Sequence, residues 1–300
     1  MENIKISKVC GLCAGCKFAI DTAIKELQSS KKVTLFKEIV HNNNVNSMLQ
    51  NKGIIFETSL NALKPSEKVI IRAHGEPKST YEFLESNQIP FVDCTCVNVK
   101  KIHEQVELFS KNGYQIIIIG KYGKKSGVMH PEIVGTVGWC ESEPILIEDS
   151  DDLLKIKNHN GKKFYLVCQT TFNMEKADIL INNISNICDK NHHELVVNKS
   201  ICMAQKQINI FSVKLAEECD LMIVVGGKNS SNSLELFNNV KNYTKSIFIE
   251  NIHDYESALA QNNISLSKNM KIGLTAGAST IKSELEELKI LLQNKLKELD

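Results

Sequence analysis

The sequence predicts an α/β fold made of three related repeats, with mainly parallel sheets arranged about a pseudo-threefold axis. Strand-like apolar runs alternate with stretches of helical apolar spacing along the chain. The same order of elements recurs three times, and a cysteine stands at the same step of each repeat: Cys13, Cys96 and Cys202. Strands that alternate with helices favour parallel sheets joined by right-handed crossovers.

Each repeat begins with a helix that follows its cysteine. Apolar residues recur there at the three- and four-residue spacing of one helix face. These residues are Cys16, Ile20, Ala23, Ile24 and Leu27 in the first repeat, Val99, Ile102, Val106 and Phe109 in the second, and Ala204, Ile208, Phe211 and Leu215 in the third. The three cysteines are therefore predicted at helix N-termini.

Four strands are predicted in each repeat. The first strands are 34–40, 114–120 and 221–227, the short second ones 54–57, 145–148 and 247–250, and the third ones 69–75, 164–171 and 271–279. A last strand, 89–96 or 193–202, leads into the next marker cysteine, and the third repeat lacks one at its own end. Residues 4–13 supply the equivalent, so we expect units 14–95, 96–200 and 201–300, the last completed by residues 1–13.

Composition excludes several classes of protein. The chain has 300 residues, 42% hydrophobic, and 36 basic against 35 acidic side chains give a net charge of +1. This profile is globular, and its charge balance argues against a nucleic-acid coat or a polybasic membrane anchor. The longest aliphatic run, Ile116 to Ile119, is far below the roughly 20 residues of a membrane-spanning helix. With no secretory or transit pattern at the start, we expect a cytoplasmic protein, or a mature organellar one whose targeting segment is absent.

Three converging cysteines point to metal chemistry. A helix N-terminus favours the thiolate, which is the metal-binding form. Three thiolates hold zinc only with a fourth ligand, but they can hold a [4Fe–4S] cluster whose open iron acts on a substrate oxygen. Cys10, Cys13 and Cys16 form a rival C-x2-C-x2-C motif, similar to the first part of a bacterial ferredoxin motif. Cys94 is a spare thiol or an alternative ligand.

Polar loops follow the predicted strands, where ligands of parallel sheets gather. They contain His41, His74 and His130, the Ser/Asn run 229–233, and a small-residue loop ending at Ser279. Hydroxyls, imidazoles and loop N–H groups suit a phosphate or diphosphate. The other five histidines, His103 among them, are expected to be surface or satisfied residues.

Glu132 is the one acid immediately inside such a loop, in His130-Pro131-Glu132. A carboxyl close to a cluster and an anionic ligand tends to keep its proton. Glu132 is therefore a candidate proton donor.

Nine motifs resemble those of one known family in content and in order. They are GLCAGC at Cys13, EIVHN at His41, RAHG at His74, TC with VNVKKIH at Cys96, HPEIVGTVG at Glu132, QTTF at Thr170, SIC at Cys202, VVGGKNSSNS at Ser230 and TAGAS at Ser279. They span about residues 10 to 280 and resemble the LytB/IspH family, the 4-hydroxy-3-methylbut-2-enyl diphosphate reductases of the non-mevalonate isoprenoid pathway.

This resemblance implies a three-lobed trefoil around a [4Fe–4S] cluster held by Cys13, Cys96 and Cys202. It implies catalysis by Glu132, which supplies protons, with Thr170 in the relay, while the open iron binds the substrate hydroxyl oxygen. Two electrons, from a donor such as ferredoxin or flavodoxin, and two protons then give isopentenyl and dimethylallyl diphosphate with loss of water. The residues implied to bind the diphosphate substrate are His41, His74, His130, Thr170, Thr171, Ser230, Ser231, Asn232 and Ser279.

The chain also departs from the pattern of the family. Cys16 stands where the family usually has Val, Cys94 where Ala is common, and Val97 where Pro is common, and the basic loop 121–129 is longer than usual. Two alternatives stay open. One is another three-cysteine trefoil enzyme such as quinolinate synthase, for whose dicarboxylate only Arg72 is available. The other is a non-enzymatic iron–sulfur or zinc redox sensor.

Overall fold

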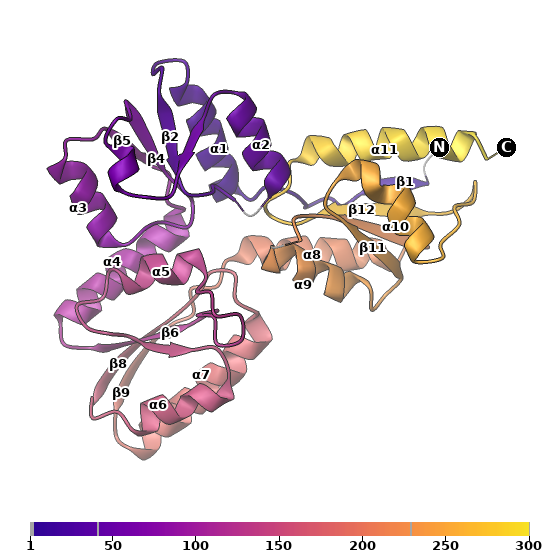
Figure 1. Cartoon of the computed structure of the whole chain (residues 1–300). Coiled ribbons are helices and arrows are strands. Elements are labelled where there is room, and N and C mark those ends of the chain that lie inside the picture. The colour runs from indigo at the N-terminus through magenta and orange to yellow at the C-terminus, as the bar shows by residue number, and fades with distance from the viewer. Residues whose placement is uncertain (1–2, 41, 229, 300) are drawn as a thin grey trace. The chain divides into compact units, whose positions relative to one another are not determined.

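Twelve strands in the described part of the chain form three four-stranded sheets, all parallel (Figure 1). The structure is a computed structural model that describes residues 3–40, 42–228 and 230–299. The chain divides into two compact units. Unit 1 comprises Met1–Ile24, Glu38–Ile54 and Met203–Asp300, and unit 2 comprises Lys25–Lys37 and Ile55–Cys202.

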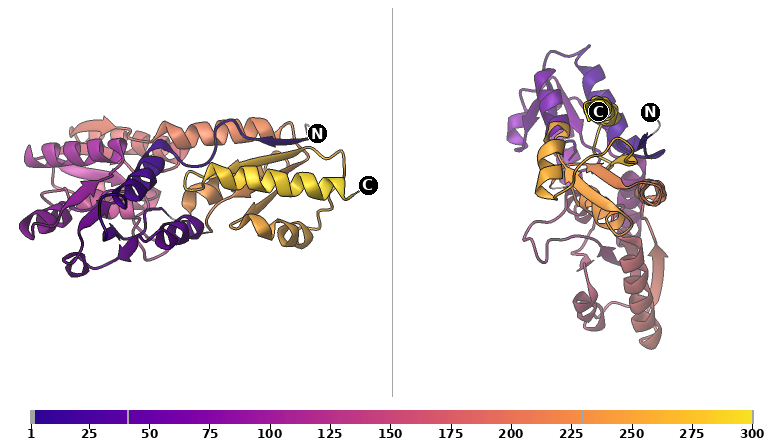
Figure 2. Two further views of the ribbon diagram at one scale, coloured as in Figure 1. Left: turned by 90° about the horizontal axis from the view of Figure 1, so that it is seen from above. Right: turned by 90° about the vertical axis from the view of Figure 1, so that its right-hand side faces the viewer.

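Unit 1 contains the sheet with strand order β1-β12-β10-β11. Its core lies on both faces, because alternate residues of a strand point to opposite sides. Ile223 and Leu274 pack with α11, whereas Met222 and Val224 pack with α8 and α9. Helix α11 thus lies on one side of this sheet and helices α8 and α9 lie on the other (Figures 1 and 2). The strands are β1 (Ile4–Ile6), β10 (Leu221–Val225), β11 (Lys245–Ile249) and β12 (Ile272–Ala276). The helices are α1 (Ala14–Glu26, which begins here), α2 (Asn43–Asn51), α8 (Met203–Ala216), α9 (Ser231–Val240), α10 (Tyr255–Gln261) and α11 (Lys282–Lys297), with η3 (Ile252–Asp254).

Unit 2 contains two sheets, the first with strand order β3-β2-β4-β5. One of its cores brings Phe36, Val69 and Ile71 from the strands together with Leu84 from α3. The strands are β2 (Val33–Phe36), β3 (Ile55–Glu57), β4 (Lys68–Ile71) and β5 (Phe91–Asp93), and the helices are η1 (Asn61–Leu63) and α3 (Lys78–Ser86).

The second sheet of unit 2 has the order β7-β6-β8-β9. Ile116 and Ile118 face a core shared with α4 and α5, and Ile117 and Ile119 face one shared with α6 and α7. The strands are β6 (Gln115–Ile119), β7 (Ile145–Ile147), β8 (Lys163–Cys168) and β9 (Glu194–Asn198). The helices are α4 (Val97–Lys111), α5 (Pro131–Val137), η2 (Ser150–Leu153), α6 (Leu154–Lys157) and α7 (Met174–Lys190).

The prediction of three α/β lobes with parallel sheets is confirmed. β1 completes the third sheet by pairing with β12, as expected for the N-terminal segment. The predicted strand 34–40 is wrong at its end: β2 stops at Phe36, because Lys37 has φ of 65°, which takes the backbone out of the extended region. The unit boundaries at residues 14, 96 and 201 stay a prediction.

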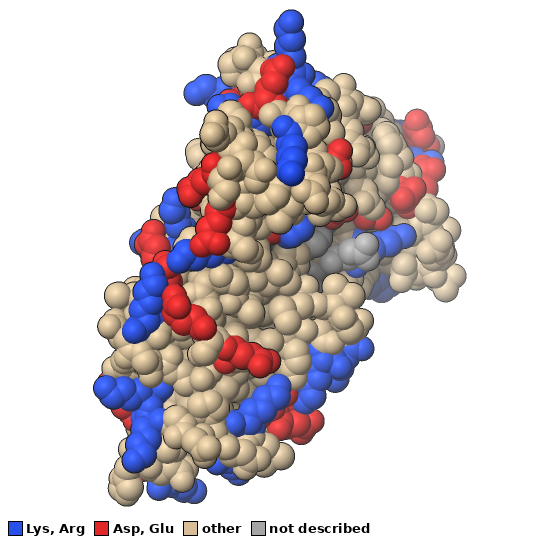
Figure 3. All heavy atoms as spheres, turned by 60° about the vertical axis from the view of Figure 1, so that its left-hand side comes forward, with Lys and Arg blue, Asp and Glu red and all other residues tan. Residues whose placement is uncertain are grey.

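In the described residues, no helix is long and apolar enough to cross a membrane. Acidic and basic side chains are interspersed on the face shown in Figure 3.

Candidate active site

The predicted site residues divide between the two units. Cys13, Ser230, Asn232 and Ser279 belong to unit 1. The residues in unit 2 are His74, Cys96, Glu132, His130, Thr170, Thr171 and Cys202. His41 and the side chain of Ser231 lie outside the described part of the structure. That Cys13 forms one centre with Cys96 and Cys202 therefore stays a prediction.

Cys13 is fixed at the carboxyl end of β12. The N–H of Leu12 donates to Thr280 O at 2.8 Å, and the N–H of Cys13 donates to Ala278 O at 3.2 Å. Helix α1 begins at the next residue, so Cys13 stands at its N-terminus as the sequence predicts. The sulfur also packs against the core between the sheet and helices α8 and α9.

The surroundings of Cys13 favour the thiolate form of its side chain. A hydrogen bond from the Cys16 thiol lowers the pKa of Cys13 to about 6, against the opposing effect of burial, and the N–H groups of Cys16 and Gly15 act in the same direction. The Cys10 thiol instead donates to Ser7 O at 3.2 Å, and burial raises its pKa. Among the described residues no three Cys, His, Asp or Glu side chains, these cysteines included, are grouped as metal ligands.

Two serine loops of unit 1 lie at the ends of β10 and β12. Ser230 caps helix α9, because its Oγ accepts the N–H of Ser233 at 3.4 Å. The Ser233 hydroxyl also donates to Ser230 Oγ at 3.1 Å, and it lies so close to Gly277 that a Cβ there would clash with it. The two loops are thus packed tightly together, and Asn232 is half-buried beside them.

Ser279 carries a buried hydroxyl with no hydrogen-bond partner among the described residues. Its backbone is held, since Asn42 Nδ2 donates to Ser279 O at 3.0 Å. Asn42 in turn caps α2 by accepting the N–H groups of Asn44 and Val45. A buried polar group without a partner costs free energy, so this hydroxyl suits a ligand oxygen.

In unit 2, Glu132 lies in the first turn of α5 and is 1% exposed. The His130 ring caps this helix, because Nδ1 accepts the Glu132 N–H at 3.2 Å, and Pro131 suits the first helical position. Thr170 holds both carboxyl oxygens: its N–H donates to Oε1 at 2.6 Å and its hydroxyl to Oε2 at 2.7 Å. The predicted pair of Glu132 and Thr170 is thus in direct contact.

Burial raises the pKa of Glu132 to about 7, and the two hydrogen bonds from Thr170 oppose this rise. A carboxyl with a pKa near neutrality can both hold a proton and release it under physiological conditions. When it is protonated the hydroxyl contact can reverse, since a hydroxyl both donates and accepts. The expectation that Glu132 keeps its proton therefore has a physical cause in its burial.

The turn that carries Thr170 also reaches Cys202, one of the three cysteines. The N–H of Cys202 donates to Thr170 O at 2.7 Å. Asn98, two residues after Cys96 in the first turn of α4, donates from Nδ2 to Cys202 Sγ at 3.5 Å. Unit 2 therefore gathers the candidate acid and the helix start that follows Cys96 around Cys202. Cys94, the alternative ligand, is fully buried.

Gln169 ties this turn to the start of the loop that ends at His130. Its Oε1 accepts the Lys121 N–H at 2.9 Å and its Nε2 donates to the half-buried Thr171 hydroxyl at 2.8 Å. Because the Thr171 oxygen accepts this hydrogen bond, the Thr171 hydroxyl can still donate its own proton to another partner. Sequence reasoning missed Gln169, and its place directly before the two threonines was the only signal.

His74 lies after β4, and its ring meets that of His130 edge-on with 5.5 Å between centroids. Gly75 follows with φ of +69°, and a Cβ there would lie 2.5 Å from His103 Cε1. His103 is 2% exposed and stacks on Trp139, and burial lowers its pKa to about 4. The expectation of a surface or satisfied residue is wrong for His103, since its buried Nε2 has no partner among the described residues.

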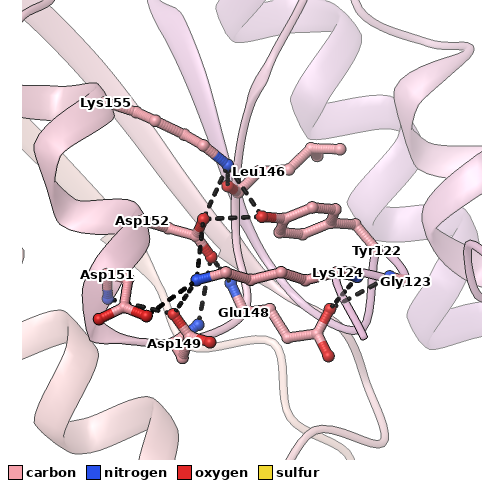
Figure 4. A network of polar contacts seen from close by, with 9 residues as sticks. All are labelled: Tyr122, Gly123, Lys124, Leu146, Glu148, Asp149, Asp151, Asp152 and Lys155. Atoms are coloured by element: carbon pink, nitrogen blue, oxygen red, sulfur yellow. Dashed lines mark hydrogen bonds and ion pairs between the residues drawn. The ribbon is translucent and has the colours of Figure 1, made fainter. Parts of the chain in front are cut away.

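A polar network fixes the basic loop 121–129 (Figure 4). Lys124 Nζ contacts Asp149 at 2.5 Å and Asp151 at 3.4 Å, and its N–H donates to Glu148 at 3.2 Å. The Tyr122 hydroxyl donates at 2.7 Å to Asp152, which is 4% exposed. The loop then returns to the site, where the His130 N–H donates to Lys121 O at 3.0 Å. The network therefore anchors the segment that carries His130.

Sequence reasoning missed a buried ion pair next to His74. Arg72 Nε donates to Glu76 Oε1 at 2.7 Å, and Lys37 Nζ approaches Oε2 at 2.6 Å. Arg72 is the only arginine in the chain. Since it is engaged with Glu76, the structure gives no support to a dicarboxylate clamp of the kind the quinolinate synthase alternative needs.

Known proteins match almost the whole chain. The family model described as "LytB protein" matches residues 4–293. A 4-hydroxy-3-methylbut-2-enyl diphosphate reductase of Clostridioides difficile is 34% identical over 293 residues, covering 97% of this chain and 99% of the relative. A protein of the same name from Clostridium acetobutylicum is 32% identical over 96% of this chain, which spans only 43% of that relative.

Two solved structures share the fold. One is described as (E)-4-hydroxy-3-methyl-but-2-enyl diphosphate reductase, the terminal enzyme of the non-mevalonate pathway, with a TM-score of 0.74 and 30% identity over 98% of this chain and all of the other. The second is the E-1-hydroxy-2-methyl-but-2-enyl-4-diphosphate reductase from Plasmodium falciparum. It has a TM-score of 0.81 and 29% identity, over 97% of this chain and 88% of that chain. With its motifs in order, its three parallel sheets and a family match over nearly its full length, the chain belongs to the LytB family.

Proposed function

We propose that this chain is a 4-hydroxy-3-methylbut-2-enyl diphosphate reductase. It takes the allylic alcohol, two electrons and two protons, and it yields isopentenyl or dimethylallyl diphosphate and water. The names of the relatives at 32–34% identity support the substrate. The observation that carries the chemistry is the buried Glu132 carboxyl, held by Thr170 through both oxygens.

Glu132 is suited to protonate the departing hydroxyl. Its raised pKa means that much of it is protonated at neutral pH. Thr170 fixes the direction of both carboxyl oxygens, so the proton is presented in one orientation rather than several. Loss of hydroxide from an alcohol requires such a donor, because hydroxide is a poor leaving group until it is protonated.

Cys13, Cys96 and Cys202 would hold a [4Fe–4S] cluster. The donor set fits, since none of the three thiols is in a disulfide, the pKa of Cys13 is lowered, and Asn98 donates to Cys202 Sγ. A cluster bound by three thiolates supplies electrons and an iron atom without a fourth protein ligand. An external donor such as ferredoxin or flavodoxin would return to the cluster the electrons that the substrate takes up.

The diphosphate would be bound by polar groups of both units. In unit 1 these are the Ser279 hydroxyl, the N-terminus of α9 at Ser230, and Ser231, Asn232 and His41. A helix N-terminus favours an anion through its free N–H groups. In unit 2 the candidates are His74, His130 and the hydroxyls of Thr170 and Thr171.

Anaerobic purification tests this proposal. We expect a brown protein that converts the hydroxylated diphosphate when a reduced dye is supplied. Cys202→Ser should lose both iron and turnover. Cys168→Ser is the matched control, because this buried thiol lies at the end of β8 in a hydrophobic core, and it should keep both.

The opposite pattern would count against the proposal. Iron or zinc content that is unchanged in Cys202→Ser favours a local metal site at Cys10, Cys13 and Cys16, as in the redox-sensor alternative. A brown wild-type protein without turnover of the diphosphate contradicts the assigned substrate.

A further inference from the structure

Cys16 is a thiol that the proposed function does not use, and it lies against one of the predicted cluster ligands. It occupies the third position of α1, while Cys13 directly precedes the helix. This is the relation between the residues of a capping box, in which the third side chain of the helix turns back toward the residue before it. Here both side chains are thiols.

The contact between the two cysteines is direct. The Cys16 thiol donates a hydrogen bond to the Cys13 sulfur, and the Cys16 N–H donates to the same sulfur at 3.5 Å. Neither cysteine is part of a disulfide, and both are half-buried. Side chains three residues apart at a helix start have Cβ atoms about 5–6 Å apart, and a disulfide needs about 3.5–4.5 Å, so side-chain rotations together with a backbone shift of about 1–2 Å would bring the sulfurs to bonding distance.

Cys10 has the same spacing to Cys13 on the other side but a different environment. Its thiol donates to Ser7 O at 3.2 Å and packs against the core formed with α11. It lies before the helix and not on it. The chain therefore contains a pair of thiols in contact and, three residues before Cys13, a third thiol that contacts other groups.

We propose that Cys13 and Cys16 form a reversible disulfide in the cluster-free protein, which makes Cys16 a resolving thiol for a ligand cysteine. The consequence for the cluster rests on the proposed function; the disulfide itself does not. A bonded Cys13 sulfur cannot bind iron, so the cluster can be inserted only after reduction. The bond also shields the Cys13 sulfur from irreversible oxidation.

The oxidant is a low-molecular-weight disulfide such as glutathione disulfide. The Cys13 thiolate attacks one of its sulfurs, forms a mixed disulfide and releases one small thiolate. The Cys16 thiolate then attacks the Cys13 sulfur and releases the second. The two cysteines lose two electrons and two protons, and the small disulfide becomes two thiols that take up both protons.

Thiol mapping of the full chain tests the proposal. Cluster-free and cluster-bound protein are treated with glutathione disulfide, alkylated and digested, and the fragment from Val9 to Lys17 is sequenced by mass spectrometry. We expect the cluster-free protein to lose two alkylation sites, Cys13 and Cys16, and the cluster-bound protein to keep them unchanged on the same timescale. A dithiol reductant should restore both.

Two variants sharpen the result. Cys16→Ser should stop at the mixed disulfide, with one glutathione on Cys13, because the resolving thiol is missing. Cys10→Ser should oxidise like the wild type. A bond between Cys10 and Cys13, or loss of two thiols from this segment in Cys16→Ser, overturns the proposal.

Iron loading separates this proposal from the proposed function. Oxidised protein should take up no cluster until it is reduced, whereas oxidised Cys10→Ser should behave like the wild type. If the Cys13–Cys16 bond forms and iron loading is unchanged, the oxidation site stands and Cys13 is not a cluster ligand. If the cluster loads onto reduced protein and no bond forms under any condition, the cluster assignment stands and the resolving role of Cys16 is wrong.

Discussion

Unit 2 contains two glutamates that are equally buried and differently partnered. Glu76 and Glu132 are each 1% exposed. Glu76 receives Arg72 at 2.7 Å and Lys37 at 2.6 Å. Glu132 receives the N–H and hydroxyl of Thr170, and with the described residues it forms no ion pair. Burial alone therefore does not distinguish a structural carboxyl from a candidate catalytic one; the charge of the partner does.

The physical basis is the cost of burying a charge. Removing a carboxylate from water is unfavourable unless cations compensate for the lost solvation. Arg72 and Lys37 provide that compensation for Glu76. Neutral donors provide less, and for this reason burial raises the pKa of Glu132 to about 7. The first glutamate fixes the turn that carries His74, and the second is poised for proton transfer.

The largest expected effect comes from replacing the acid. Glu132→Gln keeps the shape and removes the proton donor, so we expect turnover to fall by about 10²–10⁴-fold. Steady-state kinetics with a reduced dye measures this, and the iron content should not change. Turnover close to the wild-type value would remove Glu132 from the proton-transfer role.

The corresponding substitution at the other glutamate should act on stability. Glu76→Gln leaves Arg72, which is 6% exposed at its side chain, without its charge partner. Breaking a buried pair in this way costs about 3–5 kcal/mol. Denaturant unfolding measures this loss, and Glu132→Gln should lose much less. Equal destabilisation by the two variants would contradict the distinction between the two sites.

The pH dependence should carry the signature of Glu132. A proton donor acts only when it is protonated, so kcat/KM should fall as the pH rises above about 7.

The free energy of unfolding should also fall as the pH rises, because of the same carboxyl. The folded-state pKa lies above the unfolded one, so the folded form binds more protons, and stability is lost as the pH rises from about 4.3 to 7. Glu132→Gln should flatten this part of the stability curve.

Thr170→Val is a sharper variant for the same measurement. It removes the hydroxyl contact with Glu132 Oε2 and keeps the backbone one. Because that hydrogen bond favours the charged form, its loss should move the alkaline limb of the activity profile upward by about one pH unit. An unmoved or lowered limb would mean that another group sets the profile.

Sequence patterns predicted one of these glutamates and not the other. Glu132 was predicted because it follows His-Pro at a strand end, where ligands gather in parallel sheets. Glu76 gave no such signal, since Arg72 and Glu76 are joined across a turn and Lys37 comes from a distant segment. The strands were predictable because buried parallel strands are continuous apolar runs. The end of β2 was not, because no local pattern signals the positive φ of Lys37, whose side chain pairs with Glu76 from a distant segment.

The smallest effect should come from Lys37, the outer partner of Glu76. Its side chain is 31% exposed, so solvent already stabilises its charge when the pair is broken. In Lys37→Met the buried Arg72 still compensates Glu76. We therefore expect a loss of at most about 1 kcal/mol in denaturant unfolding, well below that of Glu76→Gln. A loss as large as that of Glu76→Gln would mean that Lys37, and not Arg72, holds the carboxylate charge.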